Sequence, residues 1–457
     1  MLTRRESVQL KLHCITIEEL VPANHFLRKL EAAVDFSFIY DEVRDLYCPD
    51  NGRPGMDPVM LVKYLLVGYL YGIESERRIE QEIQVNMAYR WFLGLDLDER
   101  VPDHSTISQN RRRRFNGANL FRRFFENILM QCIKRGLVDG KMILTDSTHV
   151  KACASSKRNI KVEVERETTD YMQRLDKYEA EGRERLEASR AIKPQRIKHE
   201  KRPRITERTA NTADPDAGLL GRPGKPDGMH YLSHQSVDAA HGIVVDVAVT
   251  SGNTNDSQPY LNRIEHMRDH IGLDIQIAGA DSSYGTSLIY RAMEDMGIVL
   301  HTPESSTGGV TYKVEFTREL FEYDEQHDRF ICPAQKYLTL RSLERENFNV
   351  CRTYRADRND CKACPMINKC VSDSQRSRTI RMNIFEQSVR RQRAMDATPQ
   401  HEHILNLRQV WCEGTFAAQK WMHNLRRLFR RGLEAAEDHC LPSVIALNLK
   451  RMVKCLG

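Results

Sequence analysis

The chain has 457 residues, 40% of them apolar and 29% charged, which is enough for two or three domains with a large buried core. No apolar run could span a bilayer, and the amino terminus lacks the apolar segment of a secretory signal, so we expect a cytoplasmic protein without a membrane partner. In that setting the 12 cysteines argue against a disulfide framework. A net charge of +6 is too mild to imply DNA binding by itself, so local basic clusters carry more information.

Residues 1–120 are predicted to be helical. Asp57-Pro58 is a strong helix start, because a capping residue is followed by proline at the first helical position. The predicted helix covers Val59–Tyr71 and ends at Gly72. A second helix is predicted at Glu76–Asn86.

A third helix in this region is predicted to begin at Pro102–Thr106. Four consecutive basic residues lie near its end: Arg111, Arg112, Arg113 and Arg114. Short helices, a tight glycine turn and a basic last helix indicate a helix-turn-helix-like module for DNA binding or dimerisation. A solvated helix end is the alternative interpretation of the arginine run.

The first strand of a second domain is predicted from an apolar run that starts near Lys141 and ends at Asp146. Residues 158–224 then interrupt the pattern, since they are dense in Lys, Arg and Glu and have few apolar anchors. We expect a long exposed helix or hairpin there, followed by a flexible stretch over Pro203–Gly224. Such charge is typical of a solvated surface, and contact with DNA or a partner is the alternative.

Two more strands are predicted at Met229–Val237 and Ile243–Thr250, where β-branched residues recur. A polar turn at Asn253–Ser257 follows, and it precedes a predicted helix at Gln258–Ile271. Asp256 lies in this turn, and we interpret it as the cap of that helix.

Asp281 ends the next apolar strand of the chain. Asp238 and Asp246 also lie in strand context, and they compete with Asp146 for any functional role. Tyr284 follows Asp281 closely; it either packs in the core or stacks on a splayed DNA base.

A second interruption covers residues 305–387 and is marked by its cysteines. A Cys-x-x-Cys pair with two further cysteines at moderate distance is a pattern for a structural Zn²⁺ site: Cys332, Cys361, Cys364 and Cys370. Zinc would stabilise an insertion that lacks a core of its own. Cys351 is an alternative ligand, and reduced cysteines without a metal are the alternative interpretation.

The last functional pattern is a predicted helix that begins at Glu413 and runs to Arg431. Lys420 follows Glu413 by almost two helical turns, so the two lie on one face, which Arg427 and Arg431 continue. Three apolar residues lie on the opposite side and can pack on a sheet: Phe416, Leu425 and Phe429. Lys420 is then a candidate DNA-phosphate ligand, and an amphipathic helix with ordinary charge pairs is the alternative.

Two aspartates at strand ends and a glutamate on a later helix are the arrangement that holds a pair of divalent ions: Asp146, Asp281 and Glu413. Carboxylate oxygens are the ligands that Mg²⁺ prefers. The order and context of the three acids resemble the DDE transposases of bacterial insertion sequences. The resemblance is carried by Thr145–Lys151, Ala280–Tyr284, Glu413–Phe416, Lys420 and Arg430–Leu433.

The resemblance extends over nearly the whole chain and implies an α/β fold. It implies an RNase H-like mixed sheet flanked by helices, with an N-terminal all-α domain and a cysteine-bearing insertion. The catalytic core would comprise residues 138–304 and 388–457, on either side of the insertion at 305–387. Related transposases often have an arginine four residues before the glutamate; this chain has Gln409 there, with Arg408 beside it.

The function implied by the resemblance is DNA transposition: cleavage at insertion-sequence ends and strand transfer into target DNA. Two Mg²⁺ or Mn²⁺ ions would be bridged by Asp146, with Asp281 on one and Glu413 on the other. The implied partners are double-stranded DNA, as terminal repeats and target, and further copies of the chain in a homodimer or larger assembly on DNA. The implied location is the bacterial cytoplasm, in association with the nucleoid. A transposase-derived DNA-binding protein without catalysis is the alternative, and a nuclease that cleaves without joining strands is another.

Overall fold

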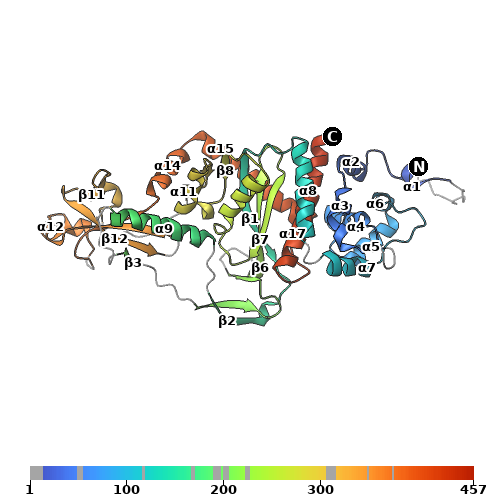
Figure 1. Cartoon of the computed structure of the whole chain (residues 1–457), viewed down its shortest axis with the longest axis horizontal. Coiled ribbons are helices and arrows are strands. Elements are labelled where there is room, and N and C mark those ends of the chain that lie inside the picture. The colour runs from blue at the N-terminus through green and yellow to red at the C-terminus, as the bar shows by residue number, and fades with distance from the viewer. Residues whose placement is uncertain are drawn as a thin grey trace, which may run out of the picture.

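A computed structural model describes residues 14–48, 55–115, 119–165, 170–188, 197–198, 205–221, 227–304, 315–346, 349–372 and 375–457. The molecule is elongated (Figure 1), with the N-terminal helices at one end, an α/β core in the middle and the cysteine-bearing segment at the other end. None of the described helices combines the length and apolar character needed to cross a membrane.

The N-terminal region is helical, as predicted. Its α-helices are α1 (Ile17–Leu20), α2 (Phe26–Ala33), α3 (Phe38–Val43), α4 (Pro58–Tyr71), α5 (Glu76–Val85), α6 (Met87–Leu93) and α7 (His104–Asn110). The local signals at α4 act as expected: the Asp57 carboxylate accepts hydrogen bonds from the backbone N–H groups of Val59 and Met60. Gly72 ends this helix with φ +68°, a left-handed conformation that favours glycine.

The central sheet has the strand order of an RNase H-like fold. Its main strands are β1 (Met142–Lys151), β6 (Gly228–Asp238), β7 (Val244–Ser251), β8 (Ile277–Gly279) and β9 (Val299–His301). Their order is β7-β6-β1-β8-β9; β6 is antiparallel to β1 and β7, whereas β8 is parallel to β1 and β9. The short strand β5 (Gly218–Leu220) pairs with the start of β6. The predicted mixed sheet is therefore confirmed.

One boundary in this sheet differs from the prediction. Asp146 does not end β1 but lies in its middle, opposite Gln235 of β6. The strand continues because Thr148 and Val150 are buried and the ladder with β6 extends to Lys151. The polar residues that follow Asp146 are thus part of the same strand, which has one buried face.

Helices cover the sheet and connect it to the N-terminal region. They are α8 (Leu120–Lys134), α10 (Tyr260–Glu265), α11 (Ser287–Asp295), α14 (Glu386–Asp396), α15 (Pro399–Arg408), α16 (Gly414–Met422) and α17 (Leu433–Leu456). Helix α17 is apolar around most of its circumference, and it packs against α8, α4 and β7. It therefore joins the helical region to the core (Figure 1).

The charged insertion at 158–224 contains more regular structure than predicted. The long helix is present as α9 (Asp170–Ala188), and a two-stranded ribbon forms from β2 (Asn159–Glu165) and β4 (Ile205–Asn211). The flexible stretch was predicted wrongly for residues 205–220, because β4 pairs with β2 and β5 pairs with β6. Residues 203–204 and 222–224 of that prediction lie outside the described residues.

The cysteine-bearing insertion also differs from the prediction, because it has a core of its own. Its strands are β10 (Glu322–Asp324), β11 (Arg329–Ile331), β12 (Tyr337–Glu346), β13 (Asn349–Ala356) and β14 (Thr379–Asn383), joined in that order, with β3 (Ile197–Lys198) beside β12. Phe330, Leu338 and Tyr354 are fully buried in it. Two short helices carry cysteines: α12 (Arg358–Lys362) and α13 (Ile367–Cys370).

The helix predicted from Glu413 to Arg431 is shorter in the structure. Helix α16 ends at Met422, and Asn424 adopts a left-handed φ of +61°. The Asn424 side chain then donates hydrogen bonds to the carbonyls of Gly68 and Ile73, which fixes the turn against α4. Arg427 and Arg431 therefore do not continue the face of Glu413 and Lys420.

Candidate active site

Asp146 is the centre of the candidate site. Its carboxylate accepts a hydrogen bond from Arg408 Nη1 at 2.8 Å, and both side chains are largely buried. Burial raises the pKa of the Asp146 carboxyl to about 6, and the guanidinium of Arg408 opposes that shift. A buried carboxyl with a raised pKa marks a candidate functional group.

Asp281 lies beside Asp146, as the sequence predicted. It lies two residues after the end of β8, which is hydrogen-bonded to β1, and its carboxylate accepts a hydrogen bond from the backbone N–H of Ser282 at 2.6 Å. The negative charge of Asp281 adds to the raised pKa of Asp146, so the two carboxylates are close enough to repel. Bringing a divalent cation to this place would relieve that repulsion.

Asp256 is a third acid at this place, and the sequence interpretation missed it. It was assigned as a helix cap, but α10 begins only at Tyr260, without a side-chain cap. The Asp256 carboxylate instead accepts a hydrogen bond from the Ser147 hydroxyl at 2.7 Å, and it also raises the pKa of Asp146. The one sequence signal was an acid shortly after a strand, a signal that many helix caps share.

Glu413 lies at the end of a segment that packs on the strand carrying Asp146. It ends η8 (Gln409–Glu413), a π turn that packs on β1 and β6, and its side chain is exposed. Among the described residues, Asp146, Asp281 and Glu413 do not form a group with ligand atoms within 4.8 Å of one another. The structure thus brings two of the three predicted carboxylates together and leaves the third at the rim.

The π turn explains the unusual position of the arginine. In an α-helix, residues four apart lie on one face and are joined by backbone hydrogen bonds. In a π turn, the backbone hydrogen bond joins residues five apart. Arg408 precedes η8 and lies five positions before Glu413 (413 − 408 = 5). The turn therefore gives Arg408 the position that an α-helix would give to the residue four before the glutamate.

Helix α15 and η8 are fixed tightly on the sheet. Thr398 caps α15, and Pro399 occupies its first position. Behind the helix, a Cβ added to Gly279 of β8 would lie 2.9 Å from Ile404. Trp411 of η8 packs on Gly242, where an added Cβ would lie 2.2 Å from its ring and φ is +74°. Both glycines therefore allow the close approach that positions Arg408.

Lys420 reaches β1 from α16. Its ammonium group donates a hydrogen bond to the Thr148 hydroxyl at 2.6 Å, on the face of β1 that also carries Asp146. Next to it, Trp421 is 75% exposed and the Arg426 guanidinium lies 3.7 Å from its ring centroid. This is an exposed surface with cationic and aromatic groups at the edge of the site.

The other arginines predicted to bind DNA are either exposed to solvent or engaged in contacts within the protein. Arg427 is exposed, and its backbone bridges to Lys151, whereas Arg431 donates to the carbonyl of Cys153. In the N-terminal run, Arg111 pairs with a glutamate at 2.8 Å and Arg114 stacks on a tyrosine ring.

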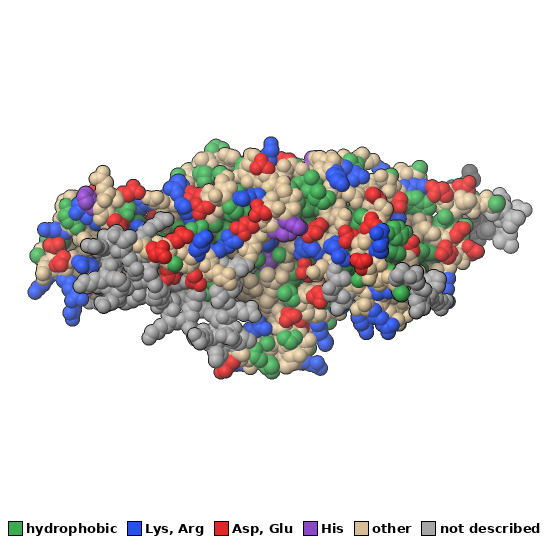
Figure 2. Space-filling view, in the orientation of Figure 1, with side chains coloured by type: hydrophobic (Ala, Val, Ile, Leu, Met, Phe, Trp, Pro, Cys, Tyr) green, Lys and Arg blue, Asp and Glu red, His purple; other side chains and the backbone are tan. Residues whose placement is uncertain are grey.

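Arg112 and Arg113 remain exposed within η2 (Arg111–Phe115). Figure 2 shows Lys and Arg side chains interspersed with acidic ones on the visible face, rather than gathered in one stripe. No single basic path crosses that face.

The competing acids and Tyr284 have structural surroundings. Asp246 pairs with Arg263 at 2.6 Å, and Asp238 accepts hydrogen bonds from the backbone N–H groups of Gly140 and Ala240. Tyr284 is completely buried, so the suggestion that it stacks on a DNA base is wrong. Packing against Tyr260 explains its place in the core.

The four predicted zinc ligands lie around one cavity of the insertion, but among these described residues no three sulfur atoms lie within 4.8 Å of one another. Cys332, Cys361, Cys364 and Cys370 line one small cavity, together with apolar residues. Burial raises the pKa of the Cys361 and Cys370 thiols, and the neighbouring cysteines add to the shift. The Cys332 sulfur accepts a backbone N–H from Lys336 at 3.3 Å. The alternative ligand, Cys351, lies on β13 and does not line this cavity.

Two family models match the sequence. Residues 15–113 match "Transposase domain (DUF772)", and residues 331–453 match "Transposase DDE domain". The second match contains Glu413, Lys420 and the four cysteines, whereas Asp146 and Asp281 lie between the matched segments. No curated protein matches the sequence.

Solved structures of transposases also align with the chain. A piggyBac transposase synaptic complex with hairpin DNA is 9% identical, with a TM-score of 0.39, over 94% of this chain and 75% of that chain. A Mos1 transposase paired-end complex with the left transposon end is 9% identical, with a TM-score of 0.16, over 56% and 62%. A Mos1 mariner paired-end complex with Mn is 10% identical, with the same TM-score and coverage.

Scores this low do not establish a common fold, so the fold assignment rests on the strand order described above. A DDE family implies the use of divalent metal ions. The carboxylates around Asp146 fit that requirement, since their mutual repulsion calls for a cation. On the two family matches, the chain is a DNA transposase of the DDE family.

Proposed function

We propose that this transposase cleaves DNA at the ends of an insertion sequence and transfers the strands to target DNA, with Asp146, Asp281 and Glu413 as its catalytic carboxylates. The observation that carries the proposal is the buried Asp146 carboxyl, whose pKa is raised to about 6 by burial and by two neighbouring acids. Such a site gains most from a divalent cation, because the cation offsets several negative charges at once.

Two Mg²⁺ or Mn²⁺ ions, when bound, would supply an activated water or 3′-hydroxyl and charge stabilisation for in-line displacement at phosphorus. Asp146, Asp281 and Glu413 would hold these ions. Asp256 is close enough to Asp146 to assist, and its hydrogen bond from Ser147 holds it in place. Glu413 would complete the site from the exposed end of η8.

Arg408 is a positioning residue in this proposal. Its ion pair with Asp146 neutralises the buried carboxylate before a cation arrives. A bound cation would supply the same neutralisation, and the Arg408 guanidinium would then be available to a DNA phosphate. A five-residue turn makes this arrangement possible with the arginine one place earlier than in related transposases.

The DNA surface in this proposal starts at Lys420 and continues over Trp421, Arg426 and Arg427. Cationic groups there can contact phosphates, and an exposed indole can stack on an unpaired base. Arg112 and Arg113 are the free part of the N-terminal arginine run, which would contact duplex DNA away from the cut. Pairing two element ends calls for a homodimer or larger assembly on DNA.

The proposed function also suggests how the chain is divided into domains. Residues 1–120 form the helical DNA-binding or dimerisation region, residues 138–304 and 388–457 the catalytic core, and residues 305–387 the insertion. Within that insertion, the four cysteines that line one cavity would bind a structural Zn²⁺ through their thiolates. The backbone N–H of Lys336 is directed at the Cys332 sulfur, and a metal-bound sulfur at that position could keep this contact.

The decisive experiment is cleavage of labelled DNA that carries the flanking element ends, with Mg²⁺ or Mn²⁺, for wild type and Asp281→Ala. Cleavage that needs both the metal and Asp281 supports the proposal, and joined products distinguish a transposase from a nuclease. Metal-dependent cleavage by Asp281→Ala would remove Asp281 from the site. Tight DNA binding without cleavage by the wild type would instead favour the transposase-derived DNA-binding protein.

A further inference from the structure

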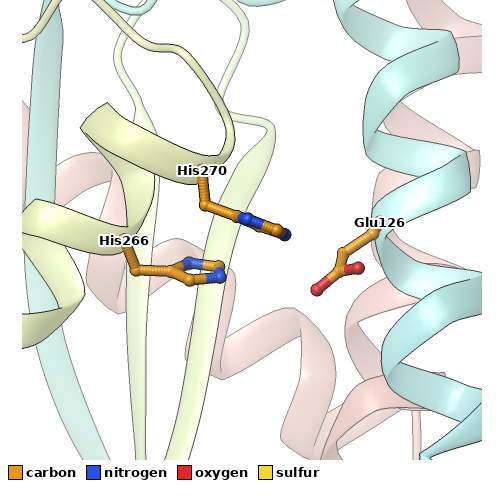
Figure 3. A group of neighbouring side chains, drawn as sticks. All are labelled: Glu126, His266 and His270. Carbon is orange, nitrogen blue, oxygen red and sulfur yellow. The ribbon is translucent and has the colours of Figure 1, made fainter.

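A second group of metal-binding side chains lies away from the carboxylate site, between α8 and the helices after β7. His266 and His270 come from η5 (His266–His270), a π turn that continues α10, and Glu126 comes from α8. Figure 3 shows the two imidazoles and the carboxylate pointing toward one another across the space between these helices. One ligand atom from each residue lies within 4.8 Å of the other two.

We propose that Glu126, His266 and His270 bind a borderline divalent cation of the Zn²⁺ type. Two imidazole nitrogens and one carboxylate oxygen are a common ligand set for zinc, with water in the fourth position. Mg²⁺ prefers oxygen ligands alone, so this site and the carboxylate site would select different ions. The proposal does not depend on how the carboxylate site works.

The geometry is close to what an ion needs. The histidine rings are stacked, with centroids 4.9 Å apart and an interplanar angle of 29°, so both present an edge to the same space. Ligand atoms around a tetrahedral Zn²⁺ are about 3.4 Å apart, given bonds of about 2.1 Å. The three side chains therefore need only small rotations to enclose an ion.

The surroundings of His266 supply a second, independent observation. Its Nδ1 atom is buried and has no hydrogen-bond partner in the structure. That atom faces the Asp246 carboxylate at 3.8 Å, and Asp246 is itself held by Arg263. A metal-bound histidine commonly directs its other ring N–H at a carboxylate, which fixes the ring and strengthens the ligand. Asp246 is positioned for that role, and Nε2 of His266 is left for the ion.

An ion here would connect two parts of the molecule. Helix α8 follows the N-terminal region, and Arg122, one turn before Glu126, binds the carbonyl of Val247 in β7 and pairs with Glu437 of α17. The cation would add a link from α8 to η5. We infer a structural role: the ion fastens the helix that leads out of the N-terminal region to the catalytic core.

The test is Zn²⁺ and Co²⁺ binding to the full-length chain after removal of metals with a chelator. The cysteine cluster is a second candidate for these ions, so binding is measured in Cys361→Ser/Cys364→Ser protein, and the Co²⁺ absorption bands are recorded. We expect one bound equivalent that His270→Ala lacks, beyond any ions at the carboxylate site, without thiolate charge-transfer absorption. His270→Ala and Glu126→Gln should each weaken binding at least about tenfold, because each removes a ligand.

His241→Ala is the matched control, because His241 is exposed and lies outside the group. It should bind like its parent, and Zn²⁺ should raise the melting temperature of parent and control but not of His270→Ala. Equal binding by His270→Ala and His241→Ala, or no bound equivalent, would overturn the proposal. If the cysteine variant does not fold, the same comparison is made in the otherwise unchanged chain, where His270→Ala must retain one Zn²⁺ equivalent fewer.

Discussion

Two aspartates of the same sheet, Asp146 on β1 and Asp246 on β7, differ in a way that separates chemistry from architecture. Both are paired with an arginine: Arg408 lies 2.8 Å from Asp146, and Arg263 lies 2.6 Å from Asp246. The Asp246 pair is nearly inaccessible, with side chains 5% and 6% exposed, and Arg263 also donates to the Ser236 hydroxyl. Its charges are balanced within the fold.

Asp146 lacks that balance. Its side chain is 19% exposed, and it shares its surroundings with Asp281 and Asp256, whose charges raise its pKa. One arginine faces a group of acids, so negative charge is in excess. A buried acid–arginine pair is therefore not by itself a sign of function. An excess of negative charge around such a pair is the feature that indicates function.

The difference between the two aspartates can be tested by neutralising each one in turn. Asp146→Asn should lower metal-dependent DNA cleavage by at least about 10⁴-fold, since groups that act as a catalytic unit fail together. DNA binding should persist, because the phosphate-binding side chains are unchanged. Cleavage rates and gel-shift binding of the two proteins provide the measurement. Near-normal cleavage by Asp146→Asn would end its assignment as the central carboxylate.

Replacing Asp246 with Asn should instead lower the stability of the protein. Asp246→Asn leaves the Arg263 guanidinium buried without its counter-ion, which should cost about 3–5 kcal/mol in the free energy of unfolding. Urea unfolding of the variant and wild type measures the loss. A stable Asp246→Asn protein with impaired cleavage would show that the buried pair serves catalysis, contrary to the comparison.

These two acids also show how far the sequence alone could go. The element that carries each acid was predictable, because apolar runs and local caps are visible in sequence, as with Asp57 at the start of α4. The partners were not visible: Asp146 meets Arg408 from 262 positions away, and Ser147 meets Asp256 from 109 positions away. Asp256 was therefore assigned to a cap that the helix does not use.

The errors in element boundaries have the same origin. The end of α16 at Met422 is set by Asn424, which donates hydrogen bonds to the carbonyls of Gly68 in α4 and of Ile73 just after it. No helical periodicity reveals these contacts. Because of the π turn at η8, the arginine lies five residues before Glu413 instead of four. A comparison of sequence spacing alone therefore finds Gln409 at the position where an arginine is expected. The insertion has its own core because its strands pair with one another. Strands β10 and β11 have only three residues each, which is too short for recognition from sequence alone.

Arg408 offers a finer test, because its removal changes the charge around Asp146 without touching an acid. Arg408→Gln should raise the pKa of Asp146 above about 6, since the cation that favours the ionised carboxylate is lost. The acid limb of the pH–cleavage profile should then move up by about one unit, since a protonated carboxyl binds metal poorly. Arg408→Lys keeps the charge and should restore most of the profile. An unchanged limb in Arg408→Gln would mean that another group sets it.

The smallest expected effect is on stability as a function of pH. The folded-state pKa of Asp146, about 6, lies above its ordinary value of 3.8, so the group contributes stability that is fully present below about pH 4 and is lost as the pH rises through 6. Asp146→Asn cannot ionise and escapes that loss. Its free energy of unfolding relative to wild type should therefore increase by about 1 kcal/mol between pH 5 and pH 8 without added metal, as measured by urea unfolding. Added Mg²⁺ should favour the wild type alone and reduce the difference, because it binds the ionised carboxylate. A difference that stays constant with pH would mean that Asp146 ionises normally in the folded protein, and the excess of negative charge that distinguishes it from Asp246 would then be absent.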